Sequence, residues 1–343
     1  MIIERAKLVK INGPIIEGLQ ENLALAMKKI VSPDLQYALL DFPNHFNVGD
    51  SAIYVGETIL CRQHFGKDPH LVSEIYEDDL HRIERMDPSV VLLLHGGGNF
   101  GDLYPRHQIF RELVVSRFPD RKIVFLPQSI HYSDQRNLSQ TQRILNGHPD
   151  LTIMVRDDVS YEFATKNFEC STVLVPDSAF MIGAVEPDID PDLKVLLLLR
   201  DDKESIVTVG AEAVNLPQPA KIVDWPHDWQ RKRKIDSLPR SIRAWLPPRV
   251  QGQFPVTPAG FEVLARKRVR RGFNILSCGE VIISDRLHAH ILATLLGKPH
   301  LVLDNNYGKV GSFMKVWTTG VIAQQVSDLE EATTVAHQMF DQN

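Results

Sequence analysis

The sequence predicts an α/β protein with two domains, each built around a parallel β-sheet. Short apolar runs that end in Gly, Asp, Asn or Pro alternate with amphipathic stretches, which is typical of repeated β-α units. A length of 343 residues suits two domains of about 150 residues or more. The segment 185–192, VEPDIDPD, is rich in proline and acidic residues and lacks periodicity. We therefore expect a linker there and domains at residues 1–185 and 186–343.

The first domain is predicted from five short apolar runs. Helices are expected after Asp50, near Pro105, near Asn137 and near Asp158, and a capping residue precedes the amphipathic run of the last two. Because the runs alternate with these helices, one doubly wound domain is expected. The expected strands are residues 36–40, 90–94, 122–126, 151–155 and 172–175.

The second domain repeats this pattern after the linker. Its first expected strand is the continuous apolar run 194–199, and residues 221–272 are read as a basic insertion. Gly297-Lys-Pro299 breaks the chain between a helix and the strand that follows it. The other expected elements are a strand at 281–284, a helix at 285–296, a strand at 300–303 and an amphipathic terminal helix at 327–341.

Composition excludes several classes of protein. With 43% hydrophobic and 24% charged residues, the chain is neither disordered, collagen-like nor a coiled coil. Its three cysteines, Cys61, Cys170 and Cys278, are too scattered for a disulfide framework or a zinc site, which favours a reducing cytoplasm. Residues 1–10 lack the pattern of a signal peptide, and no apolar run approaches about 18 residues. We expect a cytoplasmic protein, peripheral at most at the inner membrane face.

Charge is distributed unevenly along the chain. The net charge is −5, which argues against a general nucleic-acid binder. Residues 221–272 hold thirteen Lys or Arg and four acidic residues, a net +9 that leaves −14 elsewhere. Trp225, Trp229 and Trp245 are interleaved with the basic run 231–234, a combination that suits an anionic membrane surface. The alternative is a solvated lid whose tryptophans pack in the core or stack on sugar.

Ligands of parallel α/β sheets bind at the carboxyl ends of the strands, so motifs at those ends are candidate sites. The first is Asn47-x-Gly49-Asp50, which follows strand 36–40 and opens a helix. Free backbone N–H groups at a helix start favour anions or sugar hydroxyls. The alternative is that Gly49 only makes the turn and Asp50 caps the helix.

The second motif, HGGGNFGD at 95–102, follows strand 90–94 and formally matches G-x-G-x-x-G. Tyr104-Pro105 breaks the chain where a dinucleotide fold continues its helix. The next strand ends in Pro127-Gln-Ser129 rather than in an acidic residue. Nicotinamide binding is therefore disfavoured, and the motif predicts a pocket lined by backbone.

The third motif is Arg156, directly after strand 151–155. Its planar guanidinium can hold a carboxylate or a phosphate through two parallel hydrogen bonds. The alternative, which we favour for this motif alone, is that Arg156 pairs with Asp157 or Asp158 on a solvated face.

The fourth motif, Ser284-Asp-Arg286-Leu-His288-Ala-His290, stands at the next junction of strand and helix. Arg286 and His288 can both face the site from the irregular first turn, and a histidine transfers protons near neutral pH. Either histidine could instead be a core residue, and for His290 we favour that interpretation. Metal binding by the pair is poorly supported, because positions i and i+2 do not share a helix face.

Together with Pro176-Asp177 and Gly297-x-Pro299, these motifs resemble the polysaccharide pyruvyl transferase family in order and spacing, over about residues 41–311. Residues 199–204, LRDDKE, are similar to exopolysaccharide-pathway members, whereas residues 205–272 match no named pattern. The resemblance implies two Rossmann-like domains facing a cleft, as in GT-B glycosyltransferases. It also implies transfer of pyruvate from phosphoenolpyruvate to two sugar hydroxyls, forming a ketal during polysaccharide biosynthesis.

The resemblance also implies roles for single residues. Phosphoenolpyruvate carries a carboxylate and a phosphate and so needs at least two cations. Neither a metal nor another cofactor is expected, and the partners are phosphoenolpyruvate and a sugar, free or lipid-linked, without nucleic acid. A nucleotide-sugar glycosyltransferase, with Arg286 on the diphosphate and His288 as base, and a non-catalytic glycan-binding component stay open as alternatives. The implied residues are His288 for catalysis, Arg156, Arg286, Ser284, Gly97, Gly98 and Asn99 for the donor, and Asn47, Asp50 and Asp177 for the acceptor.

Overall fold

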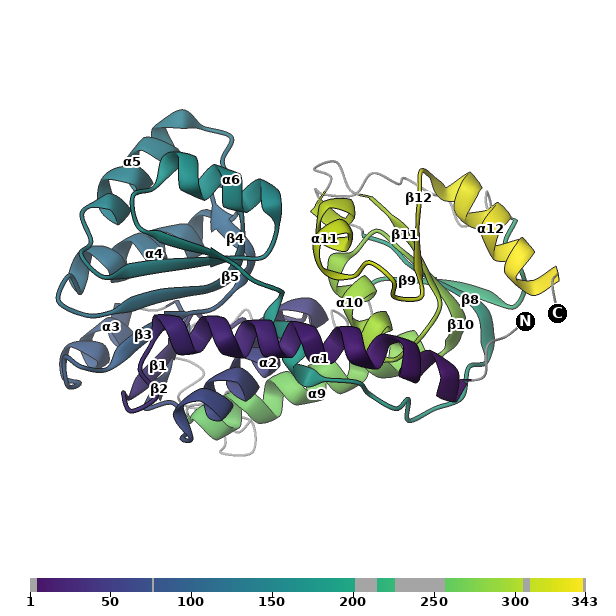
Figure 1. The fold of residues 1–343 in the computed structure, drawn as a ribbon, viewed down its shortest axis with the longest axis horizontal. Helices are drawn as coiled ribbons and strands as arrows, with labels where there is room; N and C mark the ends of the chain where they lie inside the picture. The colour runs from purple at the N-terminus through teal and green to yellow at the C-terminus, as the bar shows by residue number, and fades with distance from the viewer. Residues whose placement is uncertain (1–4, 76, 201–214, 226–256, 305–308, 342–343) are drawn as a thin grey trace, which may run out of the picture.

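The chain forms two parallel β-sheets, each covered by helices (Figure 1). The computed structural model describes residues 5–75, 77–200, 215–225, 257–304 and 309–341. Much of the basic insertion, including Trp229, Trp245 and residues 231–234, lies outside these ranges. The prediction of an α/β protein with two parallel sheets is confirmed.

The N-terminal sheet has seven strands in the described residues, and every pair is parallel. All five predicted strands are present. The strand order is β2 (Leu71–Val72), β1 (Tyr37–Leu40), β3 (Val91–Leu94), β5 (Ile123–His131), β6 (Leu151–Val155) and β7 (Ser171–Leu174), with β4 (Gly97–Gly101) paired to β5. The helices are α2 (Val48–Phe65), α3 (Glu77–Glu84), α4 (Pro105–Arg117), α5 (Gln135–Asn146) and α6 (Asp158–Asn167), and a short 3-10 helix, η1, spans Ser178–Ile182.

The predicted end of the third strand is wrong. β5 continues beyond Pro127 to His131. Proline cannot donate a ladder hydrogen bond, and the register between β5 and β6 shifts between Phe125 and Gln128, around this proline. The strand therefore carries Gln128 and Ser129 onward instead of stopping before them.

The C-terminal sheet has five parallel strands in the described residues. The predicted strands and helices of this half are confirmed, whereas β9, β12 and the helices at Pro258–Ser277 and Lys309–Trp317 were not predicted. β9 and β12 are four-residue edge strands whose residues are mostly exposed or only partly buried, so neither has the continuous apolar run of a central strand. The order is β12 (Ala323–Val326), β11 (His300–Leu303), β10 (Gly279–Ser284), β8 (Leu193–Leu198) and β9 (Ala220–Val223), with helices α9 (Pro258–Ser277), α10 (Leu287–Leu295), α11 (Lys309–Trp317) and α12 (Leu329–Asp341).

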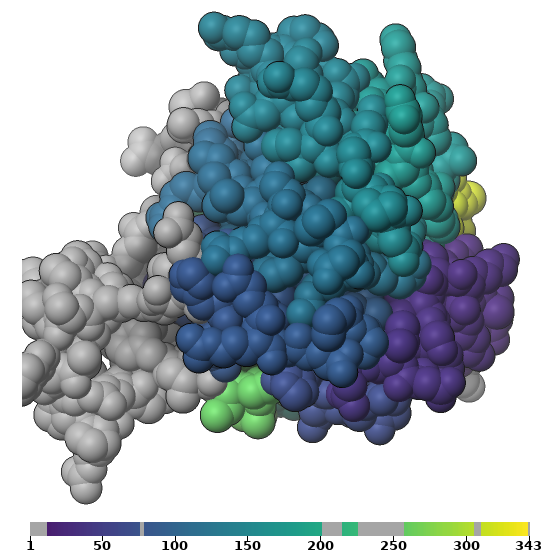
Figure 2. Space-filling view, turned by 90° about the vertical axis from the view of Figure 1, so that its left-hand side faces the viewer, coloured from purple at the N-terminus to yellow at the C-terminus, as the bar shows by residue number. Residues whose placement is uncertain are grey.

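Two long helices run beneath both sheets, α1 (Arg5–Ile30) and α9 (Figure 1). In α1, Asn12 Nδ2 donates to the Thr294 carbonyl of α10 at 2.9 Å. α9 packs on α2 of the N-terminal half, where the rings of Phe42 and Phe261 lie 4.6 Å apart. In Figure 2 the end of α9, in green, emerges directly beneath residues of the N-terminal half. Each half of the chain therefore contributes one long helix that packs on the other half.

The apolar interior is continuous between the halves. One cluster of buried residues includes Leu23 of α1, Val55 of α2, Phe273 of α9 and Leu292 of α10. Two further clusters fill the outer faces of the N-terminal and C-terminal sheets. Packing on α1 and α9 thus holds the two sheets against each other and fixes the loops between them. None of the described helices combines the length and apolar character needed to span a lipid bilayer.

Candidate active site

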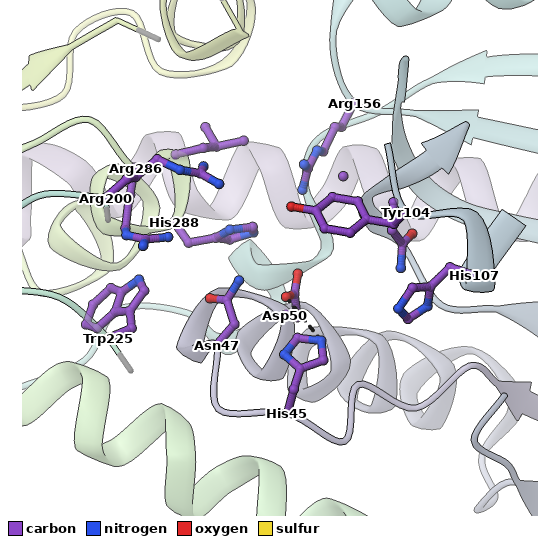
Figure 3. Close-up of a pocket in the computed structure, with 13 residues that line it drawn as sticks. His45, Asn47, Asp50, Tyr104, His107, Arg156, Arg200, Trp225, Arg286 and His288 are labelled. Atoms are coloured by element: carbon purple, nitrogen blue, oxygen red, sulfur yellow. Dashed lines mark ion pairs between the residues drawn. The ribbon is translucent and has the colours of Figure 1, made fainter. Parts of the chain in front are cut away.

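Loops from both sheets line one pocket of about 330 Å³ at the carboxyl ends of the strands. Figure 3 shows Arg200, Trp225, Arg286 and His288 on one side of it, and Tyr104, His107 and Arg156 on the other. The pocket is rich in cations and has one carboxylate among its described lining residues. The lining residues are His45, Asn47, Asp50, Gly98, Asn99, Tyr104, His107, Arg156, Arg200, Trp225, Arg286, Leu287 and His288.

The first turn of α2 forms the floor of the pocket. Asn47, not Asp50, caps this helix, because its side chain accepts from Gly49 N at 3.0 Å. Asp50 instead faces the pocket, 3.5 Å from His45 Nε2. Burial raises the pKa of Asp50, but His45, His288 and other nearby cations outweigh it and hold that pKa below its ordinary value. Asp50 is therefore available as an ionised acceptor of hydrogen bonds.

Gly49 is needed for close packing rather than for its backbone angles. A Cβ at this position would lie 2.4 Å from His288 Nδ1 and 2.6 Å from the adjacent ring carbon. The glycine therefore lets the histidine of the C-terminal half approach the start of α2. This contact joins the first and the fourth motif of the sequence.

His288 stands in the first turn of α10 and bridges the two halves of the chain. Its Nε2 lies 3.5 Å from Asp177 Oδ2 and is buried, whereas the residue lines the pocket. With Nε2 toward a carboxylate, Nδ1 is the ring nitrogen that faces away from Asp177. A neighbouring carboxylate of this kind fixes the orientation of a histidine ring.

Asp177 lies behind the pocket and not in its wall, so its prediction as an acceptor-binding residue is not matched by its position. It is fully buried, pairs with Arg156 Nη1 at 2.5 Å and accepts from Ala179 N. Burial raises the pKa of its carboxyl, but Arg156 and His288 outweigh this and hold the pKa well below its ordinary value. Asp177 thus links Arg156 to His288.

Arg156 is buried and lines the pocket, so the solvated-face alternative is wrong. Its Nε donates to Ser129 Oγ at 2.9 Å, a partner that the continuation of β5 supplies. Asp157, the partner considered from the sequence, caps α6 by accepting from Ser160 N and also accepts from Ser129 Oγ. Arg156 therefore has a fixed direction toward the pocket.

Arg286 also lines the pocket, and its Nη2 lies 2.6 Å from Asp224 Oδ1. Ser284, predicted to bind the donor, instead lies behind it. The Ser284 hydroxyl donates to the Leu198 carbonyl and accepts from Arg286 N, so it shapes the loop.

The glycine motif contributes Gly98 and Asn99 to the pocket, whereas Gly97 does not line it. Gly97 has a φ of 110°, which favours glycine, and a Cβ there would lie 3.3 Å from Ile53 Cδ1 and 3.6 Å from Asp50 Oδ1. The buried Arg111 donates to the side chain and carbonyl of Asn99 and holds this loop.

Two buried carboxylates support the same loop from below. Glu57 pairs with His95 Nδ1 and accepts from Gly96 N, both at 2.7 Å. Burial lowers the pKa of His95, but the Glu57 charge outweighs it and raises that pKa. Asp41, with a positive φ of 68°, pairs with His107 of the pocket at 2.8 Å.

Six residues of the pocket were not predicted from the sequence: His45, Tyr104, His107, Arg200, Trp225, and Leu287, which stands between the predicted Arg286 and His288. Three of them adjoin motifs that the sequence already marks, and a search of the flanking positions could have found them. Arg200 follows the strand predicted at 194–199, so its place at a strand end was a usable signal. Trp225 had no signal beyond its position in the basic segment.

The second histidine of the fourth motif has a clear outcome in the structure. His290 is a buried core residue, as favoured: its Nδ1 meets His300 Nε2 at 2.7 Å and its Nε2 meets Thr318 Oγ1 at 2.9 Å. In the part of the chain that the structure describes, no group of three or more His, Cys, Asp or Glu could hold a metal ion. Trp225 is buried in the core beside the pocket. Because Trp229 and Trp245 lie outside the described residues, membrane contact stays a prediction, which co-sedimentation with anionic and neutral vesicles would test.

Fold and site together define an α/β protein with two parallel sheets whose loops line one cation-rich pocket around a histidine. The family described as polysaccharide pyruvyl transferase matches residues 47–307. Pyruvyl transferase 1 of Schizosaccharomyces pombe is 33% identical over 322 residues, which are 90% of this chain and 76% of that protein. EpsO of Bacillus subtilis is 33% identical over 288 residues, 82% of this chain and 85% of that protein.

The chain belongs to the polysaccharide pyruvyl transferase family. A crystal structure of a functionally uncharacterized protein from Klebsiella pneumoniae matches the fold with a TM-score of 0.57 at 17% identity, covering 90% of this chain and 99% of that one. The resemblance predicted from the sequence motifs is thus confirmed, and membership implies a transferase.

Proposed function

We propose that the protein transfers pyruvate from phosphoenolpyruvate to two hydroxyls of one sugar residue, forming a ketal in polysaccharide biosynthesis. The observation that carries this proposal is the convergence of Arg156, Arg286 and His288 on one pocket from both sheets. Two guanidiniums suit the carboxylate and the phosphate of the donor, and the histidine suits proton transfer. We take the two sheets to face a shared cleft, as in GT-B enzymes.

The reaction needs protons at defined atoms. A proton is added to the methylene carbon of the donor, which makes its neighbouring carbon electrophilic, and the first sugar hydroxyl attacks that carbon. Phosphate then leaves, and the second hydroxyl attacks and closes the ketal. The protons of the two hydroxyls balance the new methyl C–H bond and the proton carried away by phosphate.

In this proposal His288 moves these protons. Asp177 lies 3.5 Å from its Nε2, and its Nδ1 packs against Gly49, so the ring is held from two sides where it lines the pocket. Asp50, ionised and on the floor, accepts a hydrogen bond from a sugar hydroxyl in this proposal. The proposed transfer uses no resident metal or cofactor, and the acceptor is a free or lipid-linked sugar handled in the cytoplasm.

The test is turnover of phosphoenolpyruvate in the presence of a panel of free and lipid-linked sugars. Release of phosphate together with a sugar product that gains one pyruvate ketal, seen by mass spectrometry and NMR, supports the proposal. Transfer of a sugar from a nucleotide sugar, with no consumption of phosphoenolpyruvate, would assign the pocket to a glycosyltransferase instead. Glycan binding without turnover of either donor would indicate a binding component.

A further inference from the structure

Two neighbouring strand ends deliver arginines to the same side of the pocket. β8 and β10 pair in parallel, with Leu198 opposite Ser284. Arg200 stands two residues beyond Leu198, and Arg286 two residues beyond Ser284. Both arginines line the pocket, and Figure 3 shows them together on the side of the C-terminal sheet.

The residues before Arg286 hold the two strand ends in register. Ser284 Oγ donates to the Leu198 carbonyl, and Asp285 Oδ1 accepts from Arg200 N at 3.0 Å. Asp285 is only 1% exposed, so this contact is shielded from water. The backbone of Arg200 is therefore positioned by the same motif that presents Arg286 and His288.

The charges of the predicted donor-binding arginines are already offset by the protein. Arg156 pairs with Asp177, and Arg286 pairs with Asp224. A phosphate near neutral pH carries about two negative charges, and a carboxylate carries one. The donor thus brings about three negative charges, and three arginines, Arg156, Arg200 and Arg286, line the pocket.

The two sides of the pocket differ in what they offer an anion. The C-terminal side has Arg200, Arg286 and the start of α10, a nine-residue helix whose first two residues, Leu287 and His288, line the pocket. The N-terminal side has Arg156 as the one arginine among its described lining residues. The group of higher charge is favoured on the side with two guanidiniums and a helix N-terminus.

We infer that Arg200 is a donor-binding residue and that, with Arg286 and the start of α10, it holds the phosphate of phosphoenolpyruvate, leaving the carboxylate to Arg156. Asp285 is then the positioning residue for Arg200. This inference rests on the proposed function, which it deepens by assigning the orientation of the donor. In this orientation the central carbon, which carries both the carboxylate and the phosphate oxygen, lies between the two anion sites, and the methylene carbon is bonded to it.

The test compares Arg200→Gln with Arg156→Gln against two partial ligands. Inorganic phosphate mimics one end of the donor and pyruvate the other, and their inhibition constants are measured by following phosphoenolpyruvate through its ultraviolet absorbance. Arg200→Gln is expected to raise the inhibition constant for phosphate about tenfold or more, because charge-assisted hydrogen bonds contribute about 1.5–3 kcal/mol. The inhibition constant for pyruvate is expected to rise less than about twofold. Arg156→Gln is expected to give the reverse pattern. Equal effects of Arg200→Gln on both ligands, or none, would overturn the inference.

Controls separate a contact from a structural role. Arg136→Gln, a surface arginine whose side chain is 92% exposed, should leave both constants unchanged. Asp285→Ala should weaken the binding of phosphate, as Arg200→Gln does. Asp285→Asn keeps an oxygen that accepts from Arg200 N, so it should restore phosphate binding. Failure of this rescue would overturn the positioning role.

The proposed function fails separately. If the wild type consumes no phosphoenolpyruvate with any acceptor, the reaction is wrong, and calorimetry with inorganic phosphate still decides whether Arg200 holds that anion. If the wild type turns over but Arg200→Gln has an unchanged KM for the donor, only the inference on Arg200 is overturned.

Discussion

The two sides of the pocket rest on different kinds of buried polar contact. Beneath the N-terminal side, buried carboxylates pair with cations, and beneath the C-terminal side most of the buried contacts are neutral hydrogen bonds. The N-terminal pairs are Asp177 with Arg156, Glu57 with His95, and Asp41 with Arg111. The C-terminal contacts are the ion pair of Arg286 with Asp224 and neutral hydrogen bonds, namely those of Ser284 with the Leu198 carbonyl and with Arg286 N, and of His290 with His300 and Thr318.

The histidines show the difference most directly. Burial lowers the pKa of His95, but Glu57 outweighs it and raises that pKa, so a charged histidine is stabilised on the N-terminal side. Burial lowers the pKa of His300 to about 4, so the histidine on the C-terminal side is neutral. The N-terminal side thus holds ions in fixed directions, whereas the C-terminal side holds a backbone shape. His288 belongs to the C-terminal side, and its ring lies next to Asp177 of the N-terminal side.

The largest effect is expected at His288, where the two sides meet. His288→Ala should lower kcat by about 10²–10⁴-fold, the usual contribution of a positioned acid or base, while the affinity for the donor stays nearly unchanged. Single-turnover rates and donor binding by calorimetry measure the two separately. His81→Ala, at an exposed position on α3, is the matched control. Near wild-type turnover by His288→Ala would remove His288 from the mechanism.

The next effect is on stability and compares one buried contact from each side. Asp177→Asn leaves the buried Arg156 charge uncompensated, and breaking a buried ion pair in this way costs about 3–5 kcal/mol. Ser284→Ala removes neutral hydrogen bonds at a cost of about 1 kcal/mol each. Urea unfolding at pH 7 measures both. Equal losses in the two variants would show that the contrast between the sides has no energetic meaning.

The sign of the pH dependence adds a second readout for Asp177. Because its folded pKa is depressed, its contribution is present above the ordinary carboxyl pKa of about 4 and is lost as the pH falls toward the folded value. The difference in the free energy of unfolding between wild type and Asp177→Asn should therefore become smaller at acidic pH. A difference that stays constant below pH 4 would contradict the charge-based account.

The central strands of both sheets could be predicted from the sequence, because strands buried on both faces appear as continuous apolar runs. Three elements, α9, β9 and β12, could not be found in the same way. In α9 the basic residues suggested part of a basic insertion, although Phe261, Ala265, Val269 and Phe273 recur at helical spacing and are buried. The edge strands β9 and β12 are only four residues long and mostly exposed or partly buried, so neither shows the longer apolar run of a central strand.

The site was predictable at the level of strand ends but not of side-chain direction. Arg156, Arg286 and His288 line the pocket as predicted, whereas Asp177, Ser284 and Gly97, equally close to strand ends, lie behind it. Which way a side chain points depends on partners far along the chain, as Arg156 does on Asp177 and Ser129. Spacing within one motif does not contain that information.

A smaller effect is expected from changing the shape of a cation while keeping its charge. Arg156→Lys and Arg286→Lys should each raise the KM for the donor about tenfold, because a point charge cannot replace a planar, two-pronged contact. Arg156→Lys should also lower kcat, since it disturbs Asp177 and through it His288, and Arg286→Lys should not. Steady-state kinetics separate KM from kcat. Unchanged KM in both variants would mean that neither guanidinium contacts the donor.

The smallest effect tests the two kinds of buried histidine through opposite pH trends. His300 has a folded pKa below its unfolded value of about 6.5, so its contribution is present above that value and is lost as the pH falls. His95 has a raised folded pKa, so its contribution is present below about 6.5 and is lost as the pH rises through the folded value. From pH 7.5 to 6.0 the cost of His300→Gln should therefore decrease by about 1 kcal/mol, and the cost of His95→Gln should not decrease. Urea unfolding at matched ionic strength measures both trends. Parallel trends in the two variants would contradict the distinction between charged and neutral histidines on the two sides of the pocket.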